Sequence, residues 1–194
     1  MRESADLRQG GAMGLGAFCF TTGTPGQIAP LVETYKSNIA EAEPVGDYVN
    51  DNIMGVTNFL CMEDREKAFA TAADMGMNYY TSLMMRWLDN IPKPPDMPVW
   101  PDLIPEPSVD ELKKAVELGV AAIGDPDDCI AAVQKWADIG VDQLTFSPTT
   151  NDLPEEVVLE SMELLGKEVI PHFDKDPVHR TTRQREAAVS TASV

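Results

Sequence analysis

Strand-like and helix-like segments alternate along most of this chain, and this alternation constrains the fold more than any other feature. Residues Ala17 to Phe20 and Ile53 to Cys61 are apolar enough for buried strands, and a helical pattern follows each of them. A third strand is predicted from Val141 to Phe146, behind another helix. Strands that are joined by helices run parallel, because each helix carries the chain back across the sheet. The sequence therefore predicts an α/β fold with three βα units.

Capping residues mark where the predicted helices begin. Thr24 precedes Pro25, and Gln27 stands at the third helical position, which together make a capping box. Asp125 followed by a proline is a similar start for the third helix. The last helix is predicted from Pro154 to about residue 170. Apolar residues at helical spacing predict the buried faces, helix by helix: Ile28, Leu31, Val32, Tyr35 and Ile39; Ala68, Phe69, Ala72 and Met75; Ile130, Val133 and Ala137; Val158, Met162, Leu165 and Val169.

A proline-rich segment interrupts the alternation. Seven prolines lie between Pro92 and Pro107. Because proline lacks the backbone N–H and fixes φ, this segment is predicted to be neither a helix nor an inner strand. It is either a rigid surface excursion or a lid over a functional site, and both alternatives stay open. A short helix at 109–118 follows it, and the polar residues 174–194 are predicted to form a disordered tail.

Charge and cysteine content exclude several classes of function. The formal net charge is −17, which argues against nucleic acid and against an anionic membrane surface as partners. No apolar run approaches the roughly 20 residues that span a bilayer, and no secretory signal is visible. The cysteines Cys19, Cys61 and Cys129 lie far apart and show no metal-ligand spacing, so we expect buried, reduced thiols in a cytoplasmic protein and no metal site.

Three parallel strands would leave both edges of a sheet open. Such a sheet is unusual as a free-standing unit, since parallel sheets are normally covered and extended. The pattern of elements therefore indicates part of a larger sheet or a homo- or hetero-oligomer.

Four segments resemble the C-terminal half of the luciferase-like monooxygenases, the flavin-dependent family that includes bacterial luciferase. They are Met13 to Phe18, Ile53 to Asp64, Gly124 to Phe146, and Glu160 to Phe173. The resemblance covers residues 3–173 and implies the last three βα units of a (β/α)8 TIM barrel, with the proline-rich segment as an insertion and residues 1–173 as its domain. It also implies reduced FMN, or the deazaflavin F420, bound at the carboxyl ends of the strands.

The resemblance implies a set of cofactor-binding residues. Ser4, in a Glu-Ser-Ala segment, would hold the flavin phosphate at a helix start, with Arg2 as its charge partner. Phe20 and Thr21 would flank the flavin ring, and Gln143 and Ser147 would meet the flavin or the substrate. These residues also have purely structural alternatives. The N-terminal segment with Arg2 and Ser4 could bind no ligand, Phe20 could belong to the barrel core, and Gln143 and Ser147 could cap a loop. The catalytic residues are not identified.

Tyr80, Met84 and Trp87 stand at helical spacing before the proline-rich segment. A soft aromatic and methionine surface suits an apolar organic substrate. Such a stripe is equally typical of core or of an oligomer contact, and this alternative stays open.

The function implied is that of an oxidoreductase, a monooxygenase that uses reduced flavin and O2 on a small apolar substrate, with a flavin reductase as a further partner. The first five strands of the family, and many of its flavin contacts, have no counterpart here. The alternative is therefore a non-catalytic flavin- or partner-binding relative, or a truncated product without function.

Overall fold

The centre of the computed structural model is a parallel sheet. The structure describes residues 2–19, 23–75, 78–87, 95–148, 153–176 and 178–192. The strands are β1 (Ala17–Cys19), β2 (Ile53–Cys61), β3 (Ala121–Gly124) and β4 (Gln143–Pro148). β1 and β3 pair with successive parts of one edge of β2, and β4 pairs with the other edge. All pairings are parallel, as predicted, and the sheet is three strands wide.

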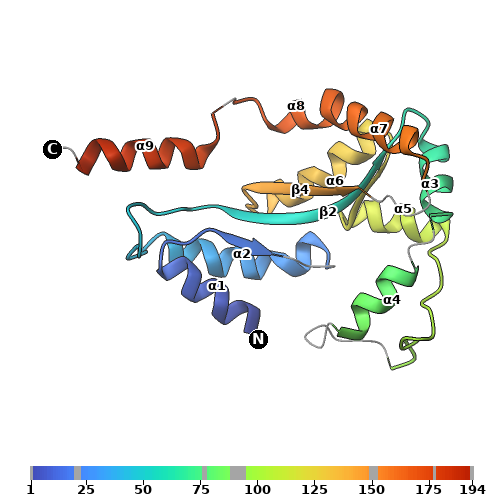
Figure 1. The fold of residues 1–194 in the computed structure, drawn as a ribbon, viewed down its shortest axis with the longest axis horizontal. Helices are drawn as coiled ribbons and strands as arrows, with labels where there is room; N and C mark the ends of the chain where they lie inside the picture. Colours follow the sequence, from blue (N-terminus) through green and yellow to red (C-terminus); the bar gives the residue numbers. More distant parts are fainter. Residues whose placement is uncertain are drawn as a thin grey trace.

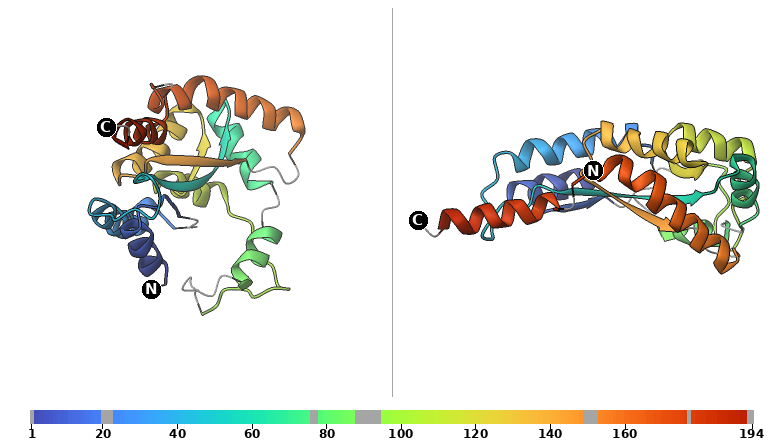
Figure 2. Two further views of the ribbon diagram at one scale, coloured as in Figure 1. Left: turned by 60° about the vertical axis from the view of Figure 1, so that its left-hand side comes forward. Right: turned by 90° about the horizontal axis from the view of Figure 1, so that it is seen from above.

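Three helices, α2, α5 and α6, form a layer on one side of this sheet (Figures 1 and 2). The right-hand view of Figure 2 shows them in a row along one side of the strands, while α7 contacts the carboxyl end of β2 through Ser161. The helices are α1 (Arg2–Ala12), α2 (Pro25–Ile39), α3 (Arg65–Ala73), α4 (Asn78–Trp87), α5 (Val109–Glu117), α6 (Pro126–Asp138), α7 (Glu155–Leu164), α8 (Ile170–Phe173) and α9 (Arg180–Ala192), with one π-helical turn, Leu165–Val169, between α7 and α8.

The predicted helix starts are confirmed in detail. The Thr24 hydroxyl accepts a hydrogen bond from the Gln27 N–H, and the Gln27 side chain accepts one from the Thr24 N–H. The Asp125 carboxylate accepts from the N–H of the third residue of α6 in the same way. β4 begins two residues later than predicted, because the Val141 N–H donates to Trp136 O in the turn that ends α6.

β3 has no counterpart among the predicted strands. It is four residues long, all four are buried, and two of them are alanines. A run this short, with a single β-branched residue, carries neither period-two alternation nor strong strand propensity. Pairing with the carboxyl end of β2 therefore decides its conformation.

Two predicted core positions are wrong. Ala137 is exposed because α6 buries Cys129, Ala132, Val133 and Trp136, a stripe offset by one position from the predicted one. Met162 is 51% exposed, and the polar neighbour Ser161 is buried instead. The Ser161 Oγ accepts a hydrogen bond from the Cys61 N–H at 2.8 Å, which compensates for the removal of its hydroxyl from water.

The tail region contains a helix where disorder is predicted. α9 extends away from the rest of the molecule and its side chains are mostly exposed (Figure 1). Its arginine, glutamate, glutamine and alanine residues favour helix without tertiary packing. All three cysteines are buried free thiols, as expected. Among the described residues, no helix is long and apolar enough to cross a membrane.

Candidate functional site

One face of the sheet is covered by helices. Along β2, Ile53, Gly55, Thr57 and Phe59 are buried, and they alternate with more exposed residues. A Cβ on Gly55 would lie 3.1 Å from the Trp136 ring, which is a tight contact, so glycine at this position lets α6 pack closely on β2. The Trp136 Nε1–H donates to Gly119 O at 2.8 Å, which satisfies the buried indole. This face is hydrophobic core.

The opposite face is open. Phe18, Met54 and Gln143 are neighbours in one row across β1, β2 and β4, and Phe18 is 53% exposed. The next rows pair Val56 with Thr145 and Asn58 with Ser147. Asn58 and all three β4 residues are exposed, which contrasts with the covered face.

Few side-chain hydrogen bonds cross the open face. The Thr145 hydroxyl donates to the Met54 sulfur at 3.0 Å, and the Asn52 amide donates to Gln143 Oε1 at 3.4 Å. An apolar surface with spaced hydroxyl and amide groups is typical of a site for a flat organic molecule. This face, from Met54 to Asn58, is the surface that a closed barrel would turn inward.

A small cavity runs along α1, from Ser4 in its first turn to Ala12 at its end. It has a volume of about 450 Å3, and its lining includes Ser4, Arg8, Gln9 and Asn38. Ser4 and Arg8 are one helical turn apart and therefore share a face of α1. A short connection joins α1 to β1, so the helix runs back along the strand and its first turn lies toward the carboxyl end of β1 (Figure 1). A hydroxyl, a guanidinium and first-turn N–H groups are suited to a phosphate.

Arg8 is the residue that the sequence did not point to. Its signal is the four-residue spacing from Ser4, which has meaning only on a helix. The resemblance implies a helix start near Ser4, but the residue pattern gave no bounds for a helix at 2–12. Arg2 is the first residue of α1, and its side chain lies outside the described part of the structure.

The remaining predicted flavin contacts separate into two groups. Phe20 and Thr21 lie outside the described residues. Gln143 and Ser147 both lie on the open face, but Gln143 is the first residue of β4 and so sits at its amino end, away from the expected mouth. Ser147 is near the carboxyl end of the same strand.

The predicted substrate residues are on α4, which is helical as their spacing indicates. Met84 is half-buried and Trp87 is 71% exposed, whereas the side chain of Tyr80 lies outside the described part. Figures 1 and 2 show α4 standing apart from the sheet, near the end where β2 finishes. The structure therefore does not bring α4 against the open face.

The described part of the proline-rich segment, residues 95–107, packs on α4 and contains only turns and irregular structure. The Ile104 N–H donates to the Ser82 hydroxyl at 2.8 Å, and Arg86 donates to Trp100 O at 2.9 Å. The rings of Tyr79 and Trp100 meet edge to face at 5.0 Å. These contacts make α4 and the segment one unit, which we call the α4–proline unit (78–87 and 95–107).

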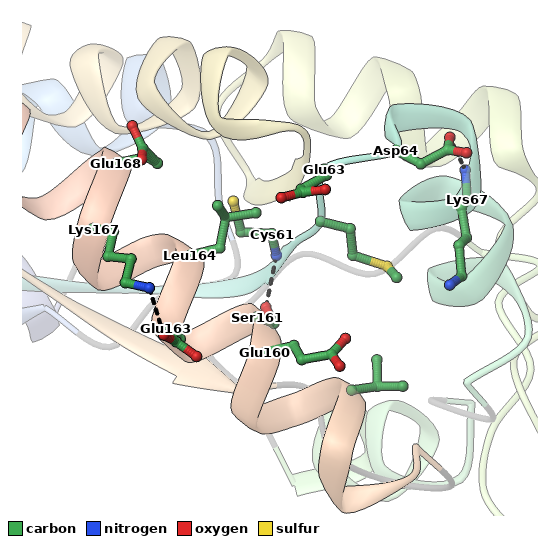
Figure 3. A pocket seen from close by; sticks show the side chains of 12 residues that line it. Cys61, Glu63, Asp64, Lys67, Glu160, Ser161, Glu163, Leu164, Lys167 and Glu168 are labelled. Atoms are coloured by element: carbon green, nitrogen blue, oxygen red, sulfur yellow. Dashed lines mark hydrogen bonds and ion pairs between the residues drawn. The ribbon is translucent and has the colours of Figure 1, made fainter.

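Another cavity lies outside the open face. It has a volume of about 650 Å3 and is lined by the end of β2, the start of α3 and one flank of α7 (Figure 3). Glu163 pairs with Lys167, which lowers the pKa of the carboxyl and raises that of the amine. Ser161 is engaged with Cys61, as described above. Two of the polar side chains that line this cavity are thus held by neighbouring groups.

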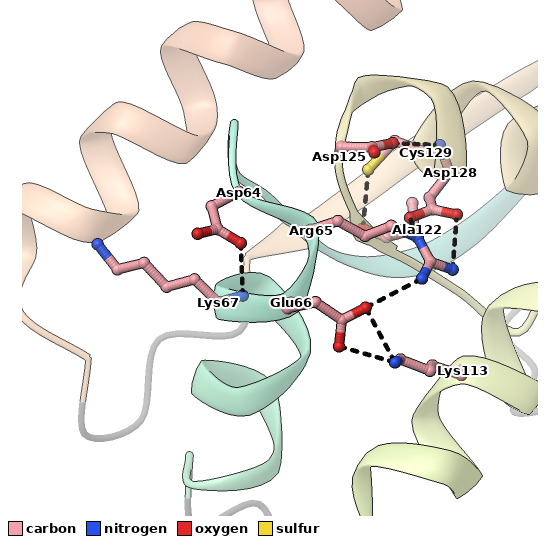
Figure 4. Close-up of polar contacts among 9 residues, drawn as sticks. All are labelled: Asp64, Arg65, Glu66, Lys67, Lys113, Ala122, Asp125, Asp128 and Cys129. Atoms are coloured by element: carbon pink, nitrogen blue, oxygen red, sulfur yellow. Dashed lines mark hydrogen bonds and ion pairs between the residues drawn. The ribbon is translucent and has the colours of Figure 1, made fainter.

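A second polar cluster joins three helices at the carboxyl ends of β2 and β3 (Figure 4). Arg65 donates to Asp128, and this hydrogen bond raises the pKa of Arg65. Lys113 donates to Glu66 and lowers its pKa. The hydrogen-bond partner Cys61 and burial raise the pKa of the Cys129 thiol, which makes it unreactive. This cluster is structural, and no group of acidic, histidine or cysteine side chains in the described ranges is placed to hold a metal ion.

Comparison with known proteins yields structural matches only. No family model matches the sequence, and no curated protein is significantly similar to it. The monooxygenase RslO1 from Streptomyces bottropensis matches 88% of this chain and 45% of its own, at 16% identity and a TM-score of 0.61. The oxygenating constituent of 3,6-diketocamphane monooxygenase from Pseudomonas putida, in complex with FMN, matches 85% and 44%, at 18% identity and a TM-score of 0.57. The structure of apo-MsnO8 matches 85% of this chain and 48% of its own, at 18% identity and a TM-score of 0.54.

The chain thus spans less than half the length of these three structures. They are luciferase-like flavin monooxygenases, and their folds are TIM barrels. The parallel sheet, its helical layer on one side and its open opposite face all correspond to a sector of such a barrel. The chain therefore has the fold of part of a luciferase-like monooxygenase barrel.

Proposed function

We propose that this chain supplies one sector of a flavin-dependent monooxygenase, and that its open sheet face and the α1 cavity bind reduced FMN. The observation that carries this proposal is the match, over 85% of the chain, to a monooxygenase structure that contains FMN. The low identity leaves the substrate to be found, and a small apolar molecule is the class that the exposed surface favours.

The side chains fit the two ends of FMN. Arg8 and Ser4 provide a cation and a hydroxyl for the phosphate. Val56 of β2 and the Ser147 hydroxyl, nearer the carboxyl ends of β2 and β4, would face the flat ring. Phe20 and Thr21 stay proposed ring contacts. F420, which also has a flat ring, is the second candidate cofactor.

The residues of this chain position the reaction rather than carry it. A reduced flavin, when bound, supplies the electrons that activate O2. Arg8 and Ser4 would fix the flavin tail, and the apolar part of the open face would exclude water from one side of the ring. Met84 and Trp87 of the α4–proline unit would contact the apolar substrate when this unit covers the carboxyl ends of the strands. A flavin reductase would supply the reduced cofactor.

The second candidate function is binding without catalysis. The specific observation in its favour is that the match ends at less than half of each barrel structure. One sector alone cannot enclose a flavin ring, so water would reach the reacting edge. We therefore expect the isolated chain to bind flavin weakly and to show no coupled oxygenation.

The test compares FMN with riboflavin, which lacks the phosphate. Titration followed by fluorescence quenching should show FMN binding at least about tenfold more tightly, because a charge-assisted hydrogen bond contributes ~1.5–3 kcal/mol. Arg8→Ala and Ser4→Ala should each reduce this difference, and Arg183→Ala, a change in another cavity, should leave it unchanged. F420 is titrated in parallel.

Equal affinities for FMN and riboflavin, or equal effects of Arg8→Ala and Arg183→Ala, would refute the proposed phosphate site. Turnover is assayed separately with reduced FMN, O2 and a long-chain aldehyde. Product formation coupled to FMN oxidation would favour the enzyme over the binding protein.

A further inference from the structure

The last helix of the chain receives little support from the sheet. α9 extends from one end of the molecule along its longest axis (Figure 1), and most of its described side chains are exposed. Its residue types favour helix, but a helix of 13 residues is marginal in water on its own, because most helical stability in proteins comes from packing. We therefore expect α9 to be stabilised by docking on another surface.

The charge of this terminal segment is opposite to that of the chain as a whole. Residues 175–194 contain four basic and two acidic residues, whereas the whole chain has a formal net charge of −17. Arg183 pairs with Asp176 and is still 58% exposed. Arg185 is exposed and lies one helical turn before Val189, which is 63% exposed. α9 thus presents exposed arginines next to an exposed apolar side chain.

The cavity between β2, α3 and α7 has complementary chemistry. Five acidic residues and two lysines line it, and Glu63 and Glu160 approach it from different walls, one after β2 and the other on α7 (Figure 3). Val157 and Leu164 add apolar side chains to the same lining. Its volume of about 650 Å3 suits side chains rather than a whole helix, which is about 10–12 Å across. A docked helix would therefore lie across this cavity and insert side chains into it.

The helix and the cavity lie at opposite ends of the molecule, α9 at one end and the start of α3 at the other (Figure 1). We propose that α9 of one copy docks on this cavity in a second copy, with Arg183 and Arg185 against the carboxylates and Val189 against the apolar lining. In an antiparallel pair with two-fold symmetry, the helix of each copy lies at the cavity of the other. Both contacts then form in one closed dimer.

The net charge does not prevent this contact. Two copies that each carry a formal charge of −17 repel one another at long range. At roughly 0.1 M salt, exposed charges more than about 10 Å apart are largely screened, whereas opposite charges in contact keep part of their attraction. Association through α9 should therefore weaken as salt is raised above this concentration. An association that is limited by net repulsion would instead become stronger.

Sedimentation of the full chain over a range of concentrations tests the proposal by charge reversal. Arg183→Glu with Arg185→Glu reverses the charge of the helix, and Glu63→Lys with Glu160→Lys reverses charges in the cavity. Each double variant alone should associate at least tenfold more weakly than the unchanged chain, because like charges then meet at both contacts. An equimolar mixture should restore association, because the acidic helix of one variant meets the basic cavity of the other.

The same mixture restores the second contact as well, since the unchanged helix of one variant meets the unchanged cavity of the other. The matched control for the cavity variant is Glu33→Lys with Glu41→Lys, which makes the same change in net charge at two exposed positions on and just after α2. This control should not weaken association. All the substituted side chains are exposed, so the variants are expected to fold, and circular dichroism verifies this.

A chain that stays monomeric at every concentration, an association that becomes stronger with added salt, or a mixture that associates no better than its components would each overturn the inference. So would a loss in the control as large as that in the cavity variant. The substitutions lie outside the open face and the α1 cavity, so the result is independent of the proposed flavin site.

Discussion

The two faces of the central sheet come from the same strands and have opposite surroundings. Ile53, Gly55 and Thr57 are buried under helices, while Met54, Val56 and Asn58, one residue along in each case, lie on the open face. On the covered face, Trp136 fits against a glycine and hydrogen-bonds to a carbonyl. On the open face, hydrogen bonds join Thr145 to Met54 and Asn52 to Gln143. The covered face therefore accounts for folding, and the open face is free to serve binding.

The largest expected contrast concerns aromatic residues on the two faces. Trp136→Ala should lower the free energy of unfolding by ~3–5 kcal/mol, because it leaves a cavity against β2. Phe18→Ala should cost less than about 1 kcal/mol, because Phe18 is 53% exposed. Urea denaturation of the two variants measures both values. Similar losses would show that the open face is also core.

The second contrast uses two serines. Ser161→Ala leaves the buried Cys61 N–H without its acceptor, which should cost ~1–3 kcal/mol. Ser147→Ala on the open face should stay within about 0.5 kcal/mol. The same denaturation assay compares them. A large cost at Ser147 would mean that its hydroxyl has a structural role.

Limited proteolysis compares the sheet and its helices with the α4–proline unit, which packs on neither face of the sheet. The segment at 95–107 contributes no ladder hydrogen bonds to the sheet and should open more readily than α5 or α6. Mass spectrometry should find the first cut in or beside this segment. Cleavage confined to residues beyond Asp174 would indicate that the unit is as rigid as the sheet.

The smallest effect concerns pH. Hydrogen bonds from Ser108 lower the pKa of Glu111, and Lys113 lowers that of Glu66, from a value of 4.5 in the unfolded chain. Because the folded pKa values are lowered, both carboxylates stabilise the fold above pH 4.5, and this contribution is lost as the pH falls through the folded values. Glu66→Gln and Glu111→Gln should flatten stability over that range in thermal unfolding. Unchanged pH profiles would count against both assignments.

The sequence predicted those parts of the fold that local chemistry determines. The strand at 53–61 and the helix starts at Thr24 and Asp125 are confirmed, because alternation and capping act within a few residues. β3 depends on pairing with β2, and the exposure of Met162 depends on the neighbouring Ser161 meeting Cys61. Both are long-range effects that no local pattern encodes.

The candidate site was predicted less completely for the same reason. Ser4 lines the α1 cavity, Ser147 is near the carboxyl end of β4, and Gln143 is the first residue of that strand. Arg8 joins Ser4 only because 2–12 is a helix, and Phe20 and Thr21 fall outside the described residues. Whether these side chains meet a flavin stays a prediction.

The central claim is that the open face binds flavin, and that the covered face and the cavity of about 650 Å3 between β2, α3 and α7 do not. An FMN titration of the 15N-labelled chain followed by NMR tests it directly. The account predicts saturable shifts at Ser4 to Gln9, Val56, Asn58 and residues 145–147, with little change at 161–168, and it predicts that Arg8→Ala weakens binding. Shifts concentrated at Glu160 to Glu168, or no saturable shift at the open face, would contradict it.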